Sequence, residues 1–195
     1  MSQCASCLGK KMIRKSIDIR KYRFSDKDRL FLDANIWLLI YGPTPRSDKD
    51  KFFKNIYSNS FKNMLLNNSK IFLDELVLSE FINAFRQLEF KRIKPEFEWH
   101  LGFKTFRNDQ EFIKIAKEIS LQSRKVINLC QRCDSFFSYM DLGPILEEYE
   151  KGHSDFNDWM YIELCKKNNF LFVTNDRDFK DSGIQMLTAN SSLLD

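Results

Sequence analysis

The sequence predicts a single α/β domain, with a central parallel sheet of four to five short strands flanked by helices on both faces. Short apolar segments alternate along the chain with longer segments of helical periodicity, and this alternation is typical of parallel sheets covered on both sides. Of the 195 residues, 43% are hydrophobic and 30% are charged, which is the composition of a globular protein. The sequence contains no internal repeat and no Gly/Ser linker, so one domain is the simplest organisation.

Each element is expected from its apolar spacing and from the residues that interrupt it. Strands are expected at 29–33, 70–73, 170–174 and 184–187. Helices are expected at 35–41, 48–66, 74–93, 109–130 and 155–168, with a short helix inside 134–152. The segment 95–108 is rich in aromatic and charged residues without a clear period, and we expect it to be an insertion.

Positive charge gathers at the start of the chain. The first 24 residues carry one acid, Asp18, and seven cations, which are Lys10, Lys11, Arg14, Lys15, Arg20, Lys21 and Arg23. Because the whole chain has a formal charge of +4, the remainder is net negative. A basic segment on an acidic body indicates contact with an anionic polymer, and a solvated tail is the alternative. We therefore divide the chain into a basic N-terminal extension, 1–28, and a folded domain, 29–195.

Several function classes are excluded by what the sequence lacks. The longest apolar run, 36–41, is far too short to span a membrane, and no apolar segment of a secretory signal follows the basic start. The phosphate-binding and dinucleotide-binding glycine motifs and the serine-hydrolase elbow are missing. Two histidines, His100 and His153, do not suffice for a His-rich zinc site.

The five cysteines are Cys4, Cys7, Cys130, Cys133 and Cys165. An odd number without an export signal indicates free thiols in a reducing compartment, and we expect a cytoplasmic protein. Two C-x-x-C pairs could supply four thiolates, but they lie much farther apart in sequence than in a zinc ribbon. A structural zinc site is therefore disfavoured. Cys165 lies in an apolar helical pattern and is expected in the core.

Acidic residues follow the predicted strands or lie in the first two turns of the predicted helices. They are Asp33, Glu80, Asp155, Asp158, Asp176 and Asp178. In parallel α/β sheets the functional crevice lies at the carboxyl ends of the strands, so these acids can converge there. Carboxylates held close together repel each other unless they share a cation. Mg²⁺ or Mn²⁺ suits such oxygen ligands and pairs with phosphate substrates.

Each acid also has a purely structural interpretation. Asp155 can cap its helix, with Asp158 favouring the helix dipole in the first turn. Asp178 can be a solvated turn residue, and Glu80 a surface carboxylate paired with Lys or Arg. Asp33 is harder to explain in this way, because apolar residues flank it and a buried acid needs a partner.

Four segments in order resemble the PIN-domain nucleases, including the VapC-type toxin ribonucleases. They are 30–36, with Asp33 and Asn35; 76–83, with Glu80; 155–162, with Asp155 and Asp158; and 170–179, with Thr174, Asp176 and Asp178. The resemblance implies a PIN-like fold and a metal-dependent endoribonuclease. The basic extension and the long stretch between Glu80 and Asp158 depart from compact VapC toxins.

The resemblance also implies roles for single residues. Asp33, Glu80, Asp158 and Asp176 would be the catalytic, metal-binding carboxylates, with Asp155 and Asp178 as further candidate ligands. Asn35 and Thr174 would fix these groups through hydrogen bonds. The seven cations of the N-terminal segment are the candidate RNA-binding residues. A second basic group, which includes Arg107, Lys114 and Lys125, is a further candidate, and for it we favour the alternative of an ordinary solvated helix face.

The implied partners are an RNA substrate and an antitoxin or other inhibitory protein, and a homodimer is left open. Two other functions remain as alternatives. The first is a catalytically inactive PIN-like module that binds RNA or protein, which the full set of four acids disfavours. The second is a structure-specific DNA nuclease, which would need a DNA-clamping element that the sequence does not identify.

Overall fold

The sheet has parallel pairing throughout the described part of the chain. The computed structural model describes residues 16–94, 106–107, 110–152 and 155–194. The strands are β1 (Ser16–Asp18), β2 (Arg29–Leu32), β3 (Lys70–Leu73), β4 (Gln131–Arg132), β5 (Leu171–Val173) and β6 (Met186–Thr188). They lie in the order β1-β6-β5-β2-β3-β4, so the described sheet has two more strands than the four that we located in the sequence.

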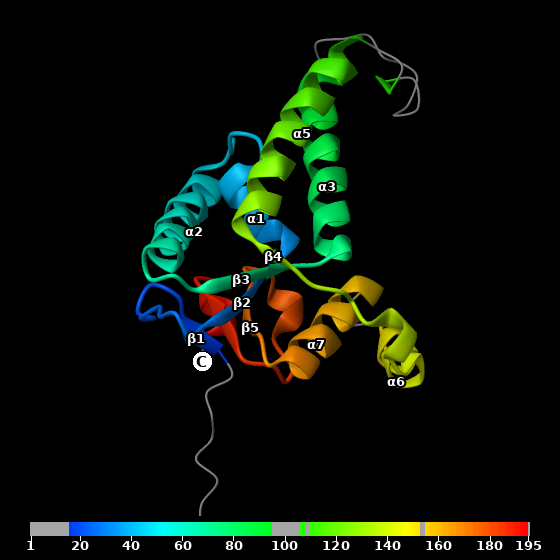
Figure 1. The fold of residues 1–195 in the computed structure, drawn as a ribbon. Coiled ribbons are helices and arrows are strands. Elements are labelled where there is room, and N and C mark those ends of the chain that lie inside the picture. Colours follow the sequence, from blue (N-terminus) through cyan, green and yellow to red (C-terminus); the bar gives the residue numbers. More distant parts are fainter. Residues whose placement is uncertain (1–15, 95–105, 108–109, 153–154, 195) are drawn as a thin grey trace, which may run out of the picture.

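Helices connect the strands and cover the sheet. They are α1 (Ala34–Tyr41), α2 (Asp48–Leu66), α3 (Glu75–Ile93), α5 (Gln110–Leu129), α6 (Leu142–Glu150) and α7 (Phe156–Asn168), with short 3-10 turns η2 (Phe137–Tyr139), η3 (Arg177–Phe179) and η4 (Ser191–Leu193). Figure 1 shows α1, α2, α3 and α5 above the sheet and α7 below it. The predicted fold class, with helices on both faces, is therefore confirmed.

Aromatic rings from adjacent strands form the centre of the core. Phe31 of β2 is fully buried and stacks against Phe170 and Phe172, with ring centroids 5.8 and 6.1 Å apart. Phe72 of β3 stacks on Phe170 at 4.5 Å. The apolar strands are buried on both faces, which is what a parallel sheet requires of its central strands.

The first strand lies inside the segment that we assigned to a basic extension. Ser16 pairs with Met186 of β6, and the side chains of Ile19 and Phe24 are 1% and 8% exposed. Residues 16–28 are thus packed into the domain rather than attached to it. The strand β1 was not predicted from the sequence because its few apolar residues lie among charged ones. Two of these charged residues, Arg20 and Asp18, form an ion pair at 2.8 Å.

The other strand absent from our prediction, β4, has only two residues and both are exposed. It carries no apolar signal, and it pairs with β3 through Gln131 and Arg132. Helices α3 and α5 form a hairpin that extends away from the sheet (Figure 1). The predicted insertion, 95–108, lies between α3 and α5 in the sequence, and all of it except 106–107 lies outside the described residues. The fully buried Phe106 packs against Phe90 and Phe112.

The structure also bears on the predicted burial of Cys165 and on the prediction that the chain does not span a membrane. Cys165 is buried in the core, as expected. Cys130 and Cys133 are free thiols, and burial raises the pKa of each to about 12. Cys4 and Cys7 lie outside the described residues. Across the ranges that the structure covers, no helix combines the length and apolar character needed to cross a membrane.

Tyr57 of α2 joins three parts of the fold through one hydroxyl group. It is 1% exposed, accepts a hydrogen bond from the Ala189 amide at 2.9 Å, and lies within hydrogen-bonding distance of the Thr174 carbonyl, 3.1 Å away, and of Asn175 Oδ1, 3.0 Å away. Burial raises the pKa of Tyr57 to about 12. This hydroxyl therefore holds α2 to the segment that follows β5.

Replacing Tyr57 by Phe should destabilise the domain by about 1–3 kcal/mol, because buried backbone groups lose their partner. The melting temperature should fall by roughly 2–10 °C, measured by circular dichroism. The matched control is Tyr149→Phe, which changes a hydroxyl that is half exposed on α6. Equal melting temperatures for Tyr57→Phe and the control would contradict this role of the hydroxyl.

Candidate active site

Parallel topology brings the predicted acids to one edge of the sheet. Asp33 directly follows β2, and Asp176 follows β5 by three residues. Helix α7 leads into β5 and runs back along the sheet, so its N-terminus, with Asp158, lies at the carboxyl edge of the strands. Glu80 lies in the second turn of α3, the helix that begins after β3. Hydrogen bonds described below join the elements that carry these groups.

The Asp33 carboxylate is the most deeply buried of these acids, at 4% exposed. It is the N-cap of α1. Its Oδ2 accepts hydrogen bonds from Asn35 Nδ2 and Thr174 Oγ1, both at 2.7 Å. The Thr174 hydroxyl in turn accepts a hydrogen bond from the Asp176 amide at 3.0 Å. The hydrogen bonds that we expected from Asn35 and Thr174 are therefore present.

Asp155 and Asp158 form a capping box at the start of α7. Asp155 accepts from the Asp158 amide at 3.0 Å, and Asp158 Oδ2 accepts from the Asp155 amide at 3.1 Å. The structural interpretation of Asp155 is thus correct. It does not exclude a second role for Asp158, because Asp158 Oδ1 has no hydrogen bond from the described residues.

Glu80 is bound by a tyrosine rather than by a surface cation. The Tyr161 hydroxyl, from α7, donates to Glu80 Oε2 at 2.7 Å. This contact joins α3 to α7 across the carboxyl edge of the sheet. Asp178 is exposed, and its carboxylate lies 3.9 Å from Arg177 Nε. The structure therefore brings Glu80 into the acid group and places Asp178 at its solvent side.

Burial and mutual repulsion make these carboxyls weaker acids than usual. Burial raises the pKa of Asp33 to about 8, opposed by the Thr174 hydrogen bond and supported by the charges of Glu80 and Asp158. Burial raises the pKa of Asp158 to about 7, and the charges of Asp155, Asp176 and Glu80 add to it. The pKa of Glu80 is also raised, mainly by burial. A concentrated group of acids without a counter-ion explains these directions.

The residues present fit a divalent cation by their chemistry. The donor set consists of carboxylate oxygens, which Mg²⁺ and Mn²⁺ prefer. One oxygen of each carboxyl of Glu80, Asp158 and Asp176 is held by a protein donor, and the other has no hydrogen bond from the described residues. The buried Asn35 Oδ1 also lacks a partner there, so it can accept from a water molecule.

The side chains are nevertheless not closed around a cation. Among the described residues, no three His, Cys, Asp or Glu side chains are arranged to hold one metal ion. Repulsion between uncompensated carboxylates favours such separation, because each turns toward its own protein donor. Binding a cation would therefore require rotations of these side chains.

Asp74 was not among the predicted site residues. It follows β3, is 3% exposed, and caps α3 by accepting from the Val77 amide at 2.8 Å. Burial raises its pKa to about 6, and the charge of Glu80 contributes. Like Asp33, Asp74 directly follows a strand, and this position could have identified it in the sequence as a candidate site residue. Its hydrogen bond to the start of α3 indicates a structural role.

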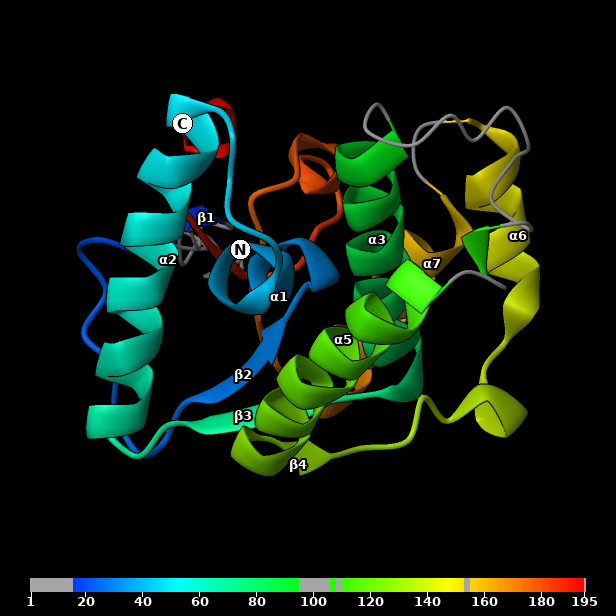
Figure 2. The ribbon, with the colours of Figure 1, turned by 90° about the horizontal axis from the view of Figure 1, so that it is seen from above.

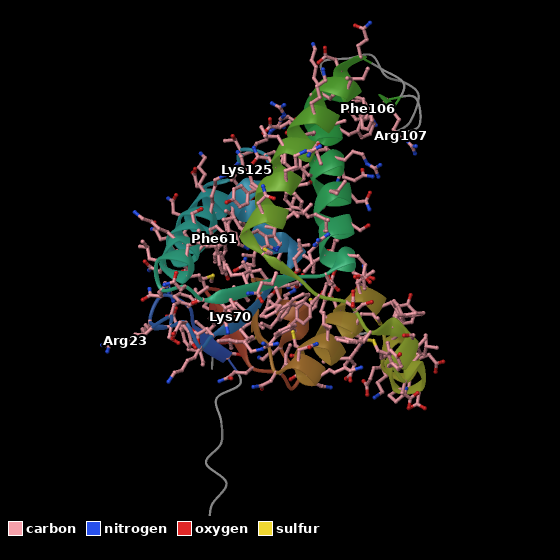
Figure 3. The ribbon with its side chains drawn as sticks, viewed as in Figure 1. Arg23, Phe61, Lys70, Phe106, Arg107 and Lys125 are labelled. Atoms are coloured by element: carbon pink, nitrogen blue, oxygen red, sulfur yellow. The ribbon has the colours of Figure 1, made fainter. Side chains whose placement is uncertain are left out.

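Two of the predicted basic residues that the structure describes, Arg20 and Arg23, lie away from the acids. Arg20 is paired with Asp18, and Arg23 is exposed at the outer edge of the molecule, far from Arg107 on the α3–α5 hairpin (Figure 3). Lys10, Lys11, Arg14 and Lys15 lie outside the described residues. A different set of cations lies next to the acids, in a cleft of about 710 Å³ that includes Asn35 and Asp176 in its lining.

Comparison with known families identifies the fold family. The PIN domain family matches residues 30–184, a span that includes all four predicted carboxylates. A search of curated proteins returned no match.

Without metal, the raised pKa values should make the domain less stable as pH rises. Folded Asp158 and Asp33 keep protons up to about pH 7 and 8, whereas the unfolded chain releases them near pH 4. Stability from these protons is therefore present below about pH 4 and lost progressively towards pH 8. Melting temperatures in EDTA from pH 4 to 8 measure the effect.

Asp158→Asn should remove part of this pH dependence. At pH 8 the variant should melt about 3 °C above the wild type, which corresponds to roughly 1 kcal/mol after allowance for solvent screening of this half-buried group. Near pH 4 the difference should vanish. Asp181→Asn, which removes an exposed acid from the loop after η3, should leave the slope unchanged. Parallel profiles for Asp158→Asn and wild type would contradict the repulsion.

Proposed function

Because the chain belongs to the PIN domain family, we propose that it is a nuclease that uses Mg²⁺ or Mn²⁺ to hydrolyse phosphodiester bonds in RNA. PIN domains are in general nucleases. One observation carries the proposal: four carboxyls from four separate elements lie at the carboxyl edge of the sheet, and three of them have raised pKa values. Repulsion between neighbouring carboxylates destabilises the folded protein, and such groups usually serve to bind a shared cation.

The proposed roles follow from the contacts of each side chain. Asp33, Glu80, Asp158 and Asp176 would hold the cation, which when bound polarises the scissile phosphate and lowers the pKa of a bound water. Asn35 and Thr174 orient the Asp33 carboxylate and favour its charged form. Tyr161 orients Glu80 by its hydrogen bond to Oε2. Asp158 Oδ1 is the candidate acceptor for the proton of the attacking water. The expected products carry a 5′-phosphate and a 3′-hydroxyl.

A toxin role is a finer form of this proposal and rests on the VapC-like motifs. In that case an inhibitory protein would cover the acid group and insert a basic side chain among the carboxylates. The same acids would serve a DNA nuclease. Parallel cleavage assays with RNA and DNA of one sequence distinguish the two substrates, and binding without cleavage would indicate an inactive module.

Asp33→Asn should lower Mg²⁺-dependent cleavage of single-stranded RNA by at least about 100-fold, because it removes a charge from the metal site. Release of a quenched fluorophore measures the rate, and circular dichroism checks the fold. Asp158→Asn should behave in the same way, and EDTA should abolish wild-type activity. Asp181→Asn is the matched control. Wild-type rates in both Asp33→Asn and Asp158→Asn would exclude these acids from the mechanism.

Deletion of residues 1–15 tests the basic segment, and it must stop before Ser16 because β1 begins there. If Lys10, Lys11, Arg14 and Lys15 contact phosphates, the affinity for RNA should fall. The slope of log affinity against log salt should become less steep by up to about 3, since each contact contributes roughly 0.7. Identical affinity and slope in the shortened protein would make the segment a tail without a role in binding.

A further inference from the structure

A basic cleft lies directly beside the acid group. It is bounded by the loop 43–46 and the start of α2, by the last turns of α3, and by the segment that leads into η3, and its volume is about 710 Å³. Figure 2 shows the start of α2 and the end of α3 facing each other on either side of the α1–α2 connection. Asn35 and Asp176 form its border with the acids.

We propose that this basic cleft binds an unpaired nucleotide of the RNA strand next to the bond that is cleaved. The inference rests on the proposed function, since it places the substrate of that same site. The volume lies within the range of small-molecule pockets, roughly 300–1,000 Å³, and is sufficient for a nucleotide. Of the four proposed metal-binding carboxylates, Asp176 lines the cleft, and the rest of the lining comes from other residues.

The cations of the cleft can bind phosphate. They are Arg46, Lys49, Lys91, Arg92 and Arg177, against the acids Asp50 and Asp176. Arg92 is held by the buried Glu89, with its Nε 2.9 Å from Oε2. Lys49 and Lys91 are exposed and form no ion pair with any described residue. These two lysines can contact phosphate without breaking an existing contact.

The same cleft has an apolar side that suits a base. Leu38, Leu39 and Phe53 line it, and Leu88 of α3 is 46% exposed there. An unpaired base can stack on or pack against such side chains, whereas the bases of a duplex are turned inward. The combination of apolar side chains and cations therefore favours a single strand.

A second cleft adjoins the basic cleft, and the two have part of their lining in common. The two clefts share the loop 43–46 and Arg92, and the second has a volume of about 1010 Å³. Its lining holds the lysines Lys54, Lys114 and Lys125 and the acids Glu89, Glu111 and Glu118. Lys114 forms an ion pair with Glu111, and Lys125 lies on α5 (Figure 3). A strand that leaves the acids through the basic cleft would reach the second cleft beside the C-terminal half of α3 and the facing part of α5 (Figure 1).

Binding is tested in EDTA, where cleavage does not interfere. The probe is a fluorescein-labelled octauridylate, and fluorescence anisotropy is followed at several salt concentrations. For the double variant Lys49→Ala/Lys91→Ala we expect about tenfold weaker binding, and a salt slope less steep by about 1.4, since two phosphate contacts in a single strand are lost. The matched control, Lys62→Ala/Lys117→Ala, removes two exposed lysines that line neither cleft and should bind as wild type.

Leu88→Ala tests the apolar side without a change of charge, because it removes apolar surface from the lining. It should weaken binding of the octauridylate and leave binding of an abasic strand of the same length unchanged. Wild-type affinity and slope in the double lysine variant would overturn the proposal, as would preferential binding of duplex RNA. Asp33→Asn separates the two proposals, because it should bind the octauridylate normally. A normal cleavage rate in Asp33→Asn would contradict the proposed function and leave the binding result standing.

Discussion

The buried carboxylate of Asp33 is the contact on which the rest of the site depends. The Asp33 carboxylate can be buried because Asn35 and Thr174 both donate hydrogen bonds to its Oδ2 atom. Thr174 also accepts from the Asp176 amide. This short chain of hydrogen bonds links the end of β2, the start of α1 and the segment after β5. A buried acid with such partners orders its surroundings, whereas an unpartnered one would destabilise the fold.

Helix starts make the concentration of acids tolerable. Asp33, Asp74 and Asp155 are N-caps, and Asp158 lies in the first turn of α7. Backbone amides and the helix dipole favour negative charge at these positions. The gain is smaller than the combined cost of burial and repulsion, as the raised pKa values of Asp33 and Asp158 indicate. The fold therefore holds the acids close enough to repel one another, and a bound cation would reduce this repulsion.

Helix α3 connects the acid group with the basic cleft. Glu80 lies near its beginning and Lys91 near its end, so one rigid element sets the distance between a carboxylate of the site and a cation of the cleft. Helix α2 completes the arrangement, since Tyr57 ties it to the segment after β5 while Lys49 lines the cleft. Opposite charges are thus kept on adjacent surfaces without neutralising one another.

The sequence by itself determined the fold class, the central strands and nearly all helix limits, because apolar periodicity and caps are local signals. It also predicted that the acids meet at one edge of the sheet, since in a parallel topology the residues after strands share an edge. It could not locate β1 and β4, whose few apolar or exposed residues carry no periodic signal. Only the tertiary structure paired Tyr161 with Glu80 and gathered Lys49 and Lys91 around one cleft, because these contacts join residues far apart in sequence whose proximity depends on how the helices pack.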